Sequence, residues 1–397
     1  MQQMGRGGCA LGWFYRTAAV WIVNTVIVFV LFNLLVSLAL SIIDTVRSST
    51  NPVSLKYHDS LASAYPDFSP DDLNRLLRET WSRPFLYEPF TQFKESPFKG
   101  SFVTVHPEGF RSVPNQAPWP PARERFFTIF LFGGSTTFNY GLPDHQTIAH
   151  DLQELLGTLR LEKTPKVYNF GRGFYFSTQE RILFEQLLTA GFIPDMAIFI
   201  DGLNEFFYPN NEPHFTGRLA ELFAKADPKV GSLLSQLVSK LPIARAARRM
   251  RETMSSPSNQ HDMQDATPHS DDDPLLHRVI DRYFQSTKLI NHAAAAYAVQ
   301  PVFVWQPIPW HKYDLRFHLF APEESAVFDA HKFGYSLMAS SIAQTPPGQN
   351  FLWCADIQEN SREPLYVDIH HYSSKGSALL ANCIFDLMKA RGLVPKD

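Results

Sequence analysis

The sequence predicts an α/β fold built on a five-stranded parallel sheet. From residue 126 onward, short apolar segments rich in β-branched and aromatic residues alternate with segments of helical character. This alternation is typical of βαβ units. The predicted strands are almost wholly apolar, which indicates a sheet covered by helices on both faces. The five strands are residues 126–132, 166–170, 195–201, 301–306 and 350–356, and the clearest helices are residues 146–157, 177–191 and 374–391.

Composition narrows the class of protein. The chain has 397 residues, 45% of them hydrophobic, and a formal net charge of −3. It can therefore bury a large core, and its charge gives no reason to expect a nucleic-acid partner. No CxxC pair suggests zinc, and no cofactor is expected. Cys354 and Cys383 could pair in an oxidising compartment, but two separate buried thiols are the favoured interpretation.

The N-terminal segment 1–46 is predicted to be a short tail followed by a membrane anchor. Residues 17–43 carry no charge, and a helix of that length reaches about 40 Å, enough to cross a hydrocarbon core of about 30 Å. A buried core helix and a cleaved signal peptide are the alternatives. The apolar region of a signal peptide is about 7–15 residues long, so an uncleaved signal anchor is favoured.

Membrane orientation is not decided by charge, because two basic residues precede the apolar segment (Arg6 and Arg16) and two follow it (Arg47 and Lys56). A long C-terminal domain behind a first hydrophobic segment usually translocates. The main domain is therefore expected outside the cytoplasm, in the periplasm or the extracellular space.

Two further regions differ from the α/β pattern. Residues 47–125 are rich in Pro and aromatic residues and are expected to pack on the main domain, with a helix at 70–82 and no catalytic role. Residues 207–297 are predicted to be an insertion. Its amphipathic part, 217–251, fits a lid, a membrane-surface helix or simple packing, and its arginines fit a solvated face. Its polar part, 255–273, lacks Phe, Tyr and Trp and is expected to be disordered.

Polar residues follow several predicted strands where a ligand site is expected. Ligands of open parallel sheets bind outside the carboxyl ends of the strands. Ser135 lies in FGGSTTF after the first strand, and Asn204 lies in DGLNE after the third. Asp368 and His371 lie in DIHHYSSKG before the last helix. A serine needs a base such as histidine to remove its proton, and a carboxylate fixes the tautomer of that histidine.

The same residues also offer donors for a developing oxyanion. Backbone N–H groups near Ser135 and near Gly173 of NFGRGF, with the side-chain amide of Asn204, are the candidates. Taken singly, each motif has an ordinary explanation: FGGST fits a phosphate-binding turn, and Asn204 or Asp368 fits a helix cap. Their joint occurrence in this order favours catalysis. A nucleotide-binding module is disfavoured because the chain lacks a Walker lysine and a clear GxGxxG.

These four blocks resemble those of the SGNH (GDSL-like) hydrolases. Ser135 matches the nucleophile, Gly173 lies in the second block, Asn204 matches GxN, and Asp368 and His371 match DxxH. The resemblance covers roughly 126–392 and implies a flavodoxin-like three-layer α/β/α sandwich with metal-free ester chemistry. It gives Ser135, Asp368 and His371 as catalytic, and Ser135, Gly173 and Asn204 as the oxyanion hole.

Two positions depart from the family pattern. The oxyanion glycine of the family falls five residues after the position of Asn169, which here is Phe174, one residue beyond Gly173. A backbone N–H from Phe174 remains possible, and its side chain would narrow the pocket. Glu205 stands where many relatives have Asp, which is expected to change only local support.

Other polar residues near the motifs compete for a role. The spacing Asp368-x-x-His371 favours His371 over His370 as the base. Asp144 and His145 are expected in a surface turn, and Trp310 and His311 are candidates for the lining of the pocket.

The leading functional hypothesis is an extracytoplasmic serine esterase acting on an acyl or acetyl ester of a small molecule, glycan or lipid. Acyl transfer to a cell-surface polysaccharide or lipid uses the same residues and stays open, because many membrane-tethered relatives modify cell-surface polysaccharide. A non-catalytic scaffold or binding module is the third alternative.

Overall fold

A computed structural model of the chain describes residues 7–49, 58–225, 240–254, 273–321 and 328–394. The chain divides into two compact units. One unit comprises residues 1–50 and 220–261, and the other comprises residues 51–219 and 262–397. The predicted disordered segment 255–273 lies almost wholly outside the described residues.

In the smaller unit, the helices α1 (Gly7–Ser49) and α11 (Pro242–Met254) pack against each other. Within α1 the segment Trp13–Ile43 has a mean hydropathy of 2.9, and only 6% of its most apolar window is buried. A helix so apolar and so exposed is a candidate membrane span, as the sequence predicts. The N–H of Ile243 in α11 donates a hydrogen bond to the Asn33 side chain of α1 (3.3 Å).

The larger unit contains a sheet of five parallel strands. They are β5 (Phe126–Gly133), β6 (Thr164–Asn169), β7 (Met196–Asp201), β8 (Gln300–Trp305) and β9 (Phe351–Trp353). Their order across the sheet is β6-β5-β7-β8-β9. This is the flavodoxin-like order, in which the chain reverses direction across the sheet between β5 and β7. The predicted fold class is confirmed.

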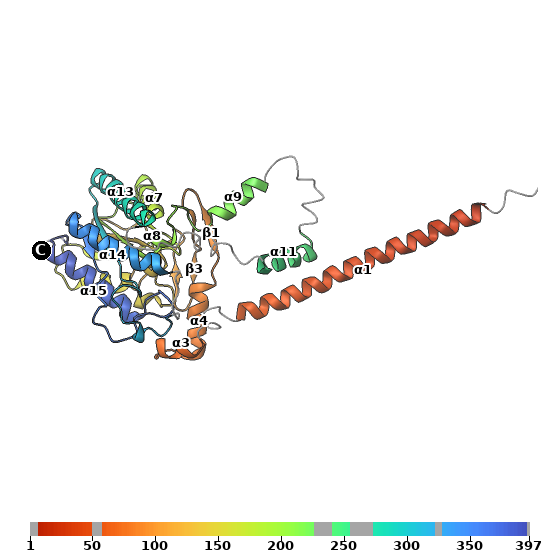
Figure 1. The fold of residues 1–397 in the computed structure, drawn as a ribbon, viewed down its shortest axis with the longest axis horizontal. Coiled ribbons are helices and arrows are strands. Elements are labelled where there is room, and N and C mark those ends of the chain that lie inside the picture. The colour runs from red at the N-terminus through yellow and green to blue at the C-terminus, as the bar shows by residue number, and fades with distance from the viewer. Residues whose placement is uncertain (1–6, 50–57, 226–239, 255–272, 322–327, 395–397) are drawn as a thin grey trace, which may run out of the picture. The chain divides into compact units, whose positions relative to one another are not determined.

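Helices cover both faces of this sheet and complete the three-layer sandwich. On one face α6 (Ile148–Gly157) packs against α15 (Ser374–Ala390). On the other face α13 (Pro274–Ala296) packs against α7 (Ser177–Thr189) and α14 (Asp329–Gln344), as Figure 1 shows. Residues 274–296, predicted as the end of the 207–297 insertion, form α13, and its buried side chains pack on β8. A parallel crossover such as that from β7 to β8 usually contains a helix.

Alternation along the strands divides the core into two parts. In β5, Phe130 and Phe132 face the α7–α13 side, whereas Ile129 and Leu131 face the α6–α15 side. The period of two in a strand produces this division. Aromatic rings therefore dominate one layer and aliphatic side chains the other.

Short elements surround the sandwich. The predicted helix at 70–82 is α4 (Pro70–Trp81), whose first turn is capped by the Ser69 side chain. The two hairpins before residue 126 were not predicted: β1 pairs with β2, and β3 with β4. The short elements are α3 (His58–Ala64), β1 (Phe85–Glu88), β2 (Gln92–Glu95), β3 (Phe98–Lys99), β4 (Thr104–Val105), α5 (Ser135–Phe138), η1 (Asp144–Gln146), α8 (Leu203–Phe207), α9 (Thr216–Lys225) and η3 (Leu315–Phe317).

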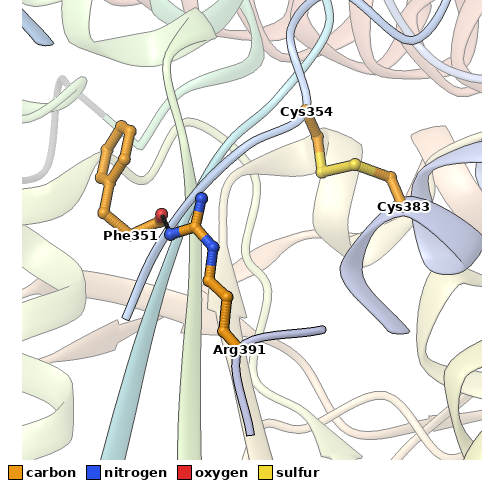
Figure 2. Close-up of a disulfide and its surroundings, with 4 residues drawn as sticks. All are labelled: Phe351, Cys354, Cys383 and Arg391. Atoms are coloured by element: carbon orange, nitrogen blue, oxygen red, sulfur yellow. Dashed lines mark hydrogen bonds between the residues drawn. A yellow bond between two sulfur atoms is a disulfide. The ribbon is translucent and has the colours of Figure 1, made fainter. Parts of the chain in front are cut away.

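A disulfide joins Cys354, just after β9, to Cys383 in α15 (Figure 2). The expectation of two separate thiols is therefore wrong. The packing of α15 against β9 brings the two Cα atoms to 6.1 Å, within the usual disulfide range. The Arg391 guanidinium, just beyond α15, also donates to the carbonyl oxygen of Phe351 in β9. Side-chain contacts thus fasten the last helix to the last strand at two points.

Candidate active site

Ser135 lies at the carboxyl end of β5, at the point where the strand order reverses. β5 ends at Gly133, and Gly134 is the N-cap residue of α5, which begins with Ser135. A Cβ at Gly134 would lie 2.3 Å from Asn204 Nδ2 and 3.0 Å from the carbonyl oxygen of Tyr175. Glycine is needed here because three chain segments meet with no room for a side chain.

Ser135, His371 and Asp368 form one continuous chain of hydrogen bonds. His371 Nε2 lies 2.8 Å from Ser135 Oγ, and His371 Nδ1 lies 2.8 Å from Asp368 Oδ2. A carboxylate accepts only, so Nδ1 carries the proton and donates it to Asp368. Nε2 is then left with its lone pair toward the serine hydroxyl. The order of the three groups is that of a nucleophile, a base and an orienting acid.

Asp368 is held as a carboxylate in a buried position. Its Oδ1 also accepts the backbone N–H groups of His370 (3.0 Å) and His371 (2.8 Å). Burial alone would raise the pKa of the Asp368 carboxyl, but charge at His371 and these hydrogen bonds hold it well below its usual range. The DxxH spacing creates this geometry, because the turn directs the backbone and the ring of His371 to the same carboxylate.

His370 does not take part in this chain of bonds. Burial and charge at His371 lower the pKa of His370 to about 3. Its Nδ1 has no partner among the described residues, and its ring lies 5.9 Å from that of Phe207. The structure therefore brings His371, rather than His370, to Ser135.

Asn204 lies at the same end of the sheet, in α8 after β7. Its Nδ2 donates to the carbonyl oxygen of Tyr175 (2.6 Å), and an amide nitrogen has a second hydrogen to donate. Because Nδ2 also lies against Gly134, the amide is held beside the turn that carries Ser135. Asn204 is thus fixed to the block after β6 and the block after β5 together.

Within the turn after β6, nearly every N–H group has an acceptor. Gly171 donates to Asn169 Oδ1 (2.9 Å), Arg172 to the carbonyl oxygen of Gly133 (2.9 Å), and Tyr175 to that of Arg172 (3.3 Å). Gly173 donates to Glu95 Oε1 (3.1 Å).

Among residues 171–175, Phe174 is the exception. Among the residues that the structure describes, its N–H has no hydrogen-bond acceptor. The N–H of Gly173, which the sequence analysis assigned to the oxyanion hole, is taken up by a carboxylate that sequence patterns did not place there.

Phe174 also adopts an unusual backbone conformation. Its φ of 65° lies in the left-handed region, which costs about 1–3 kcal/mol for a residue with a side chain. Its ring stacks on that of His214 with centroids 3.9 Å apart, and the side chain stays 37% exposed. Phe85 contacts the same ring edge-on. Phe174 is thus a strained residue with an unpaired N–H, and the carbonyl oxygen of the next residue, Tyr175, lies against Gly134.

Residues 47–125 contribute to the surroundings of the histidine, although the sequence analysis assigned them no catalytic role. The Trp81 ring, at the end of α4, meets the His371 ring edge-on at 4.8 Å. Tyr140 contacts both rings. With these neighbours His371 is only 3% exposed. No sequence motif marked Trp81, because its position depends on how α4 packs against the sandwich.

A cluster of buried acids lies behind Asn204. Asp201 ends β7, Glu180 lies on α7, and Glu205 accepts from Arg282 (2.9 Å) and from the N–H of Ser177 (2.7 Å). Burial and the neighbouring carboxylates raise the pKa of both Glu180 and Asp201 well above the ordinary values. Glu205 therefore supports the site by holding the start of α7, and does not contact the serine.

The other positions that the sequence singles out have partners of their own. Asp144 forms an ion pair with the buried Arg111 (2.9 Å). His311, a candidate for the lining, bonds to Asp356 (2.8 Å), and Trp310 stacks on Phe328. Among the described residues no group of three or more His, Cys, Asp or Glu side chains is arranged to hold a metal ion.

Comparisons with protein-family models and with curated proteins give no match. Several solved structures resemble the chain. The acetylxylan esterase Axe2 from Geobacillus stearothermophilus is 11% identical, with 66% of this chain and 93% of that one covered at a TM-score of 0.37. A proposed lipolytic protein of the G-D-S-L family from Desulfitobacterium hafniense DCB-2 is 13% identical, with 66% and 99% covered at a TM-score of 0.35.

The α/β hydrolase LAE5 from the Lake Arreo metagenome is 11% identical, with 68% of this chain and 96% of that one covered at a TM-score of 0.35. These TM-scores are too low to support an inference about function. We therefore infer the function from the geometry of the site alone.

Proposed function

We propose that this protein is a serine esterase that cleaves an acyl or acetyl ester, with Ser135 as nucleophile, His371 as base and Asp368 as the acid that orients the base. The observation that carries the proposal is the hydrogen-bond chain from Ser135 Oγ through the His371 ring to Asp368, with both spacings at 2.8 Å. His371 Nδ1 donates to Asp368, and His371 Nε2 accepts from the Ser135 hydroxyl. These are the directions that base catalysis needs.

In the proposed reaction, Ser135 Oγ attacks the ester carbonyl carbon while His371 Nε2 takes the hydroxyl proton. The carbonyl π electrons move to oxygen and form the oxyanion. Collapse of this intermediate breaks the bond to the alcohol, which leaves with the proton from Nε2. Water then attacks the acyl-serine by the same route, releasing the acid and restoring Ser135.

The proposed oxyanion hole has three donors: the N–H of Ser135, the side-chain amide of Asn204, and the N–H of Phe174 in place of that of Gly173. The first turn of a helix leaves its N–H groups without intrahelical acceptors. Asn204 is held against Gly134 beside Ser135, and Phe174 has the unpaired N–H of the neighbouring turn. Donors already in place stabilise the developing charge without reorganisation.

We also propose that the domain acts outside the cytoplasm. Two observations support this location: the candidate membrane span Trp13–Ile43 and the disulfide between Cys354 and Cys383. Disulfides persist in the periplasm and the extracellular space and are rare in the cytosol. The disulfide lies in the domain that follows the span, so it favours the orientation that basic charges leave undecided.

The experiment is labelling of the full-length protein with a fluorophosphonate probe, comparing wild type with Ser135→Ala. We expect labelling of the wild type alone, together with hydrolysis of p-nitrophenyl acetate. A wild type that does not label, or a variant that labels equally, would refute the serine mechanism. Adding sugar acceptors and analysing products tests acyl transfer: an acylated sugar supports transfer, and free acid alone supports hydrolysis.

A further inference from the structure

The hairpin β1–β2 lies outside the five-stranded sheet, yet it holds the turn after β6. Arg172 forms an ion pair with Glu88 of β1 and a hydrogen bond with the Tyr175 hydroxyl (2.9 Å). The Tyr175 hydroxyl in turn donates to the carbonyl oxygen of Phe93 in β2. Residues on both sides of Phe174 are therefore bound to the hairpin.

Glu95, at the end of β2, forms the central contact of this attachment. It is 1% exposed and accepts three hydrogen bonds: from Arg83 Nη2 (2.9 Å), from the Tyr140 hydroxyl (2.7 Å) and from the Gly173 N–H (3.1 Å). A buried carboxylate with a cationic partner and two further donors is fully satisfied. These three donors therefore hold the Glu95 carboxylate in one position.

The bond to Gly173 fixes the peptide next to the unusual one. Phe174 would relax from its left-handed conformation if the surrounding contacts allowed it, because that conformation is unfavourable for a residue with a Cβ. A Cβ at Gly173 would lie 3.0 Å from Phe85 of β1 and 3.0 Å from the Tyr140 hydroxyl, so little room is left around this residue. The hydrogen bond from Gly173 to Glu95 thus favours the conformation in which the Phe174 N–H stays unpaired.

We propose that Glu95 is a positioning residue that aligns the Phe174 N–H with the developing oxyanion. This inference rests on the proposed function. It assigns to residues 85–95 a part in the rate of reaction, through the turn and without contact with the substrate.

The alternative is that Glu95 only stabilises the fold through its ion pair with Arg83. Glu79 provides the matched comparison, because it is also a buried glutamate of this region and also accepts three hydrogen bonds. Its donors are the backbone N–H groups of Ser101, Phe102 and Val103. It makes no hydrogen bond to the turn after β6.

The test compares Glu95→Ala, Glu95→Gln and Glu79→Ala in the full-length protein. We measure kcat, KM, the midpoint of thermal unfolding and the inhibition constant of a trifluoromethyl ketone, which forms a tetrahedral adduct with the serine. We expect Glu95→Ala to lower kcat by about 10- to 100-fold, since loss of a whole oxyanion donor costs about 10²–10³-fold. KM should change less than about twofold, and ketone affinity should fall in step with kcat.

Glu95→Gln keeps an oxygen acceptor for the Gly173 N–H and should fall between wild type and Glu95→Ala. Glu79→Ala should lower the unfolding midpoint and leave kcat and ketone affinity unchanged. The inference is overturned if Glu95→Ala keeps the wild-type kcat, or if ketone affinity does not follow kcat. If Glu95→Ala does not fold, Glu95→Gln decides: an unchanged kcat and ketone affinity would overturn the inference.

The two proposals fail in different ways. The proposed function is refuted if the wild-type protein neither labels with the fluorophosphonate nor hydrolyses the ester. Only the role of Glu95 is refuted if the wild type labels and turns over while the Glu95 and Glu79 variants have the same kcat.

Discussion

Replacing Asp368 by asparagine tests the orientation of the base most directly. The asparagine oxygen can still accept the backbone N–H groups of His370 and His371, which bond to Oδ1 in the wild type. Its NH2 group would then face His371 Nδ1 and select the tautomer that has its proton on Nε2. In that tautomer the ring cannot accept the proton of Ser135, so the fold is kept while the base is disabled.

The expected fall in kcat follows from the negative charge that Asp368→Asn removes beside His371. At 2.8 Å between Asp368 Oδ2 and His371 Nδ1, an effective dielectric of about 20 gives an attraction of roughly 6 kcal/mol between carboxylate and imidazolium. Each 1.36 kcal/mol changes a rate tenfold. We therefore expect kcat for p-nitrophenyl acetate to fall by about 10⁴-fold, with little change in KM.

The chain offers a matched control in a second Asp–His pair, Asp356 and His311, whose atoms are also 2.8 Å apart. Asp356→Asn should keep nearly the full kcat, because His311 does not bond to Ser135. Initial rates of p-nitrophenyl acetate hydrolysis are measured for both variants, and thermal unfolding confirms that both are folded. An Asp368→Asn variant within about tenfold of the wild type, or an equal loss in Asp356→Asn, would refute the reasoning.

Three other outcomes follow from the structure. Asn204→Ala should lower kcat by about 10²–10³-fold at nearly constant KM in steady-state assays; a change in KM alone would contradict its oxyanion role. Reducing the Cys354–Cys383 disulfide, which closes a separation of 29 residues, should cost roughly 3–4 kcal/mol in denaturant unfolding, and an unchanged midpoint would oppose this. Burial and the Asp201 and Glu205 carboxylates raise the pKa of Glu180, so the folded state binds the extra proton and stability falls as pH rises above about 4. Glu180→Gln should remove that loss and raise the free energy of unfolding at pH 8, measured in denaturant, whereas equal pH dependence in both proteins would count against it.

The sheet could be predicted from the sequence because its strands are buried on both faces. Each of the five strands is an apolar run that ends near a glycine, a proline or a polar residue, and the pattern needs no knowledge of distant contacts. The blocks that contain Ser135 and Asn204 directly follow β5 and β7, so the sequence predicts that they lie at the same end of the sheet. In parallel sheets the carboxyl ends of neighbouring strands meet at one edge.

The contributions from residues 47–125 could not be predicted in this way. Trp81 lies at the end of α4, a helix that the sequence predicts, but its contact with His371 depends on how α4 packs against the sandwich. Glu95 lies in a hairpin that was not predicted. The Gly173 N–H donates to Glu95, a residue 78 positions away in the chain, and no local pattern predicts this bond. The disulfide was missed for a similar reason, since two cysteines in a sequence do not reveal whether their Cα atoms lie within bonding range.

The hairpin β1–β2 has a consequence for where this protein can be shortened or changed. A chain cut to begin at β5 would keep every strand of the main sheet and each of the residues Ser135, Asn204, Asp368 and His371. It would lose the carboxylate that holds the Gly173 peptide, together with the tryptophan that packs against the base. It would also lose core side chains such as Phe93 and Phe110, so we expect both its stability and its turnover to fall. Selection could equally adjust the rate through residues 85–95 and leave the reacting groups untouched.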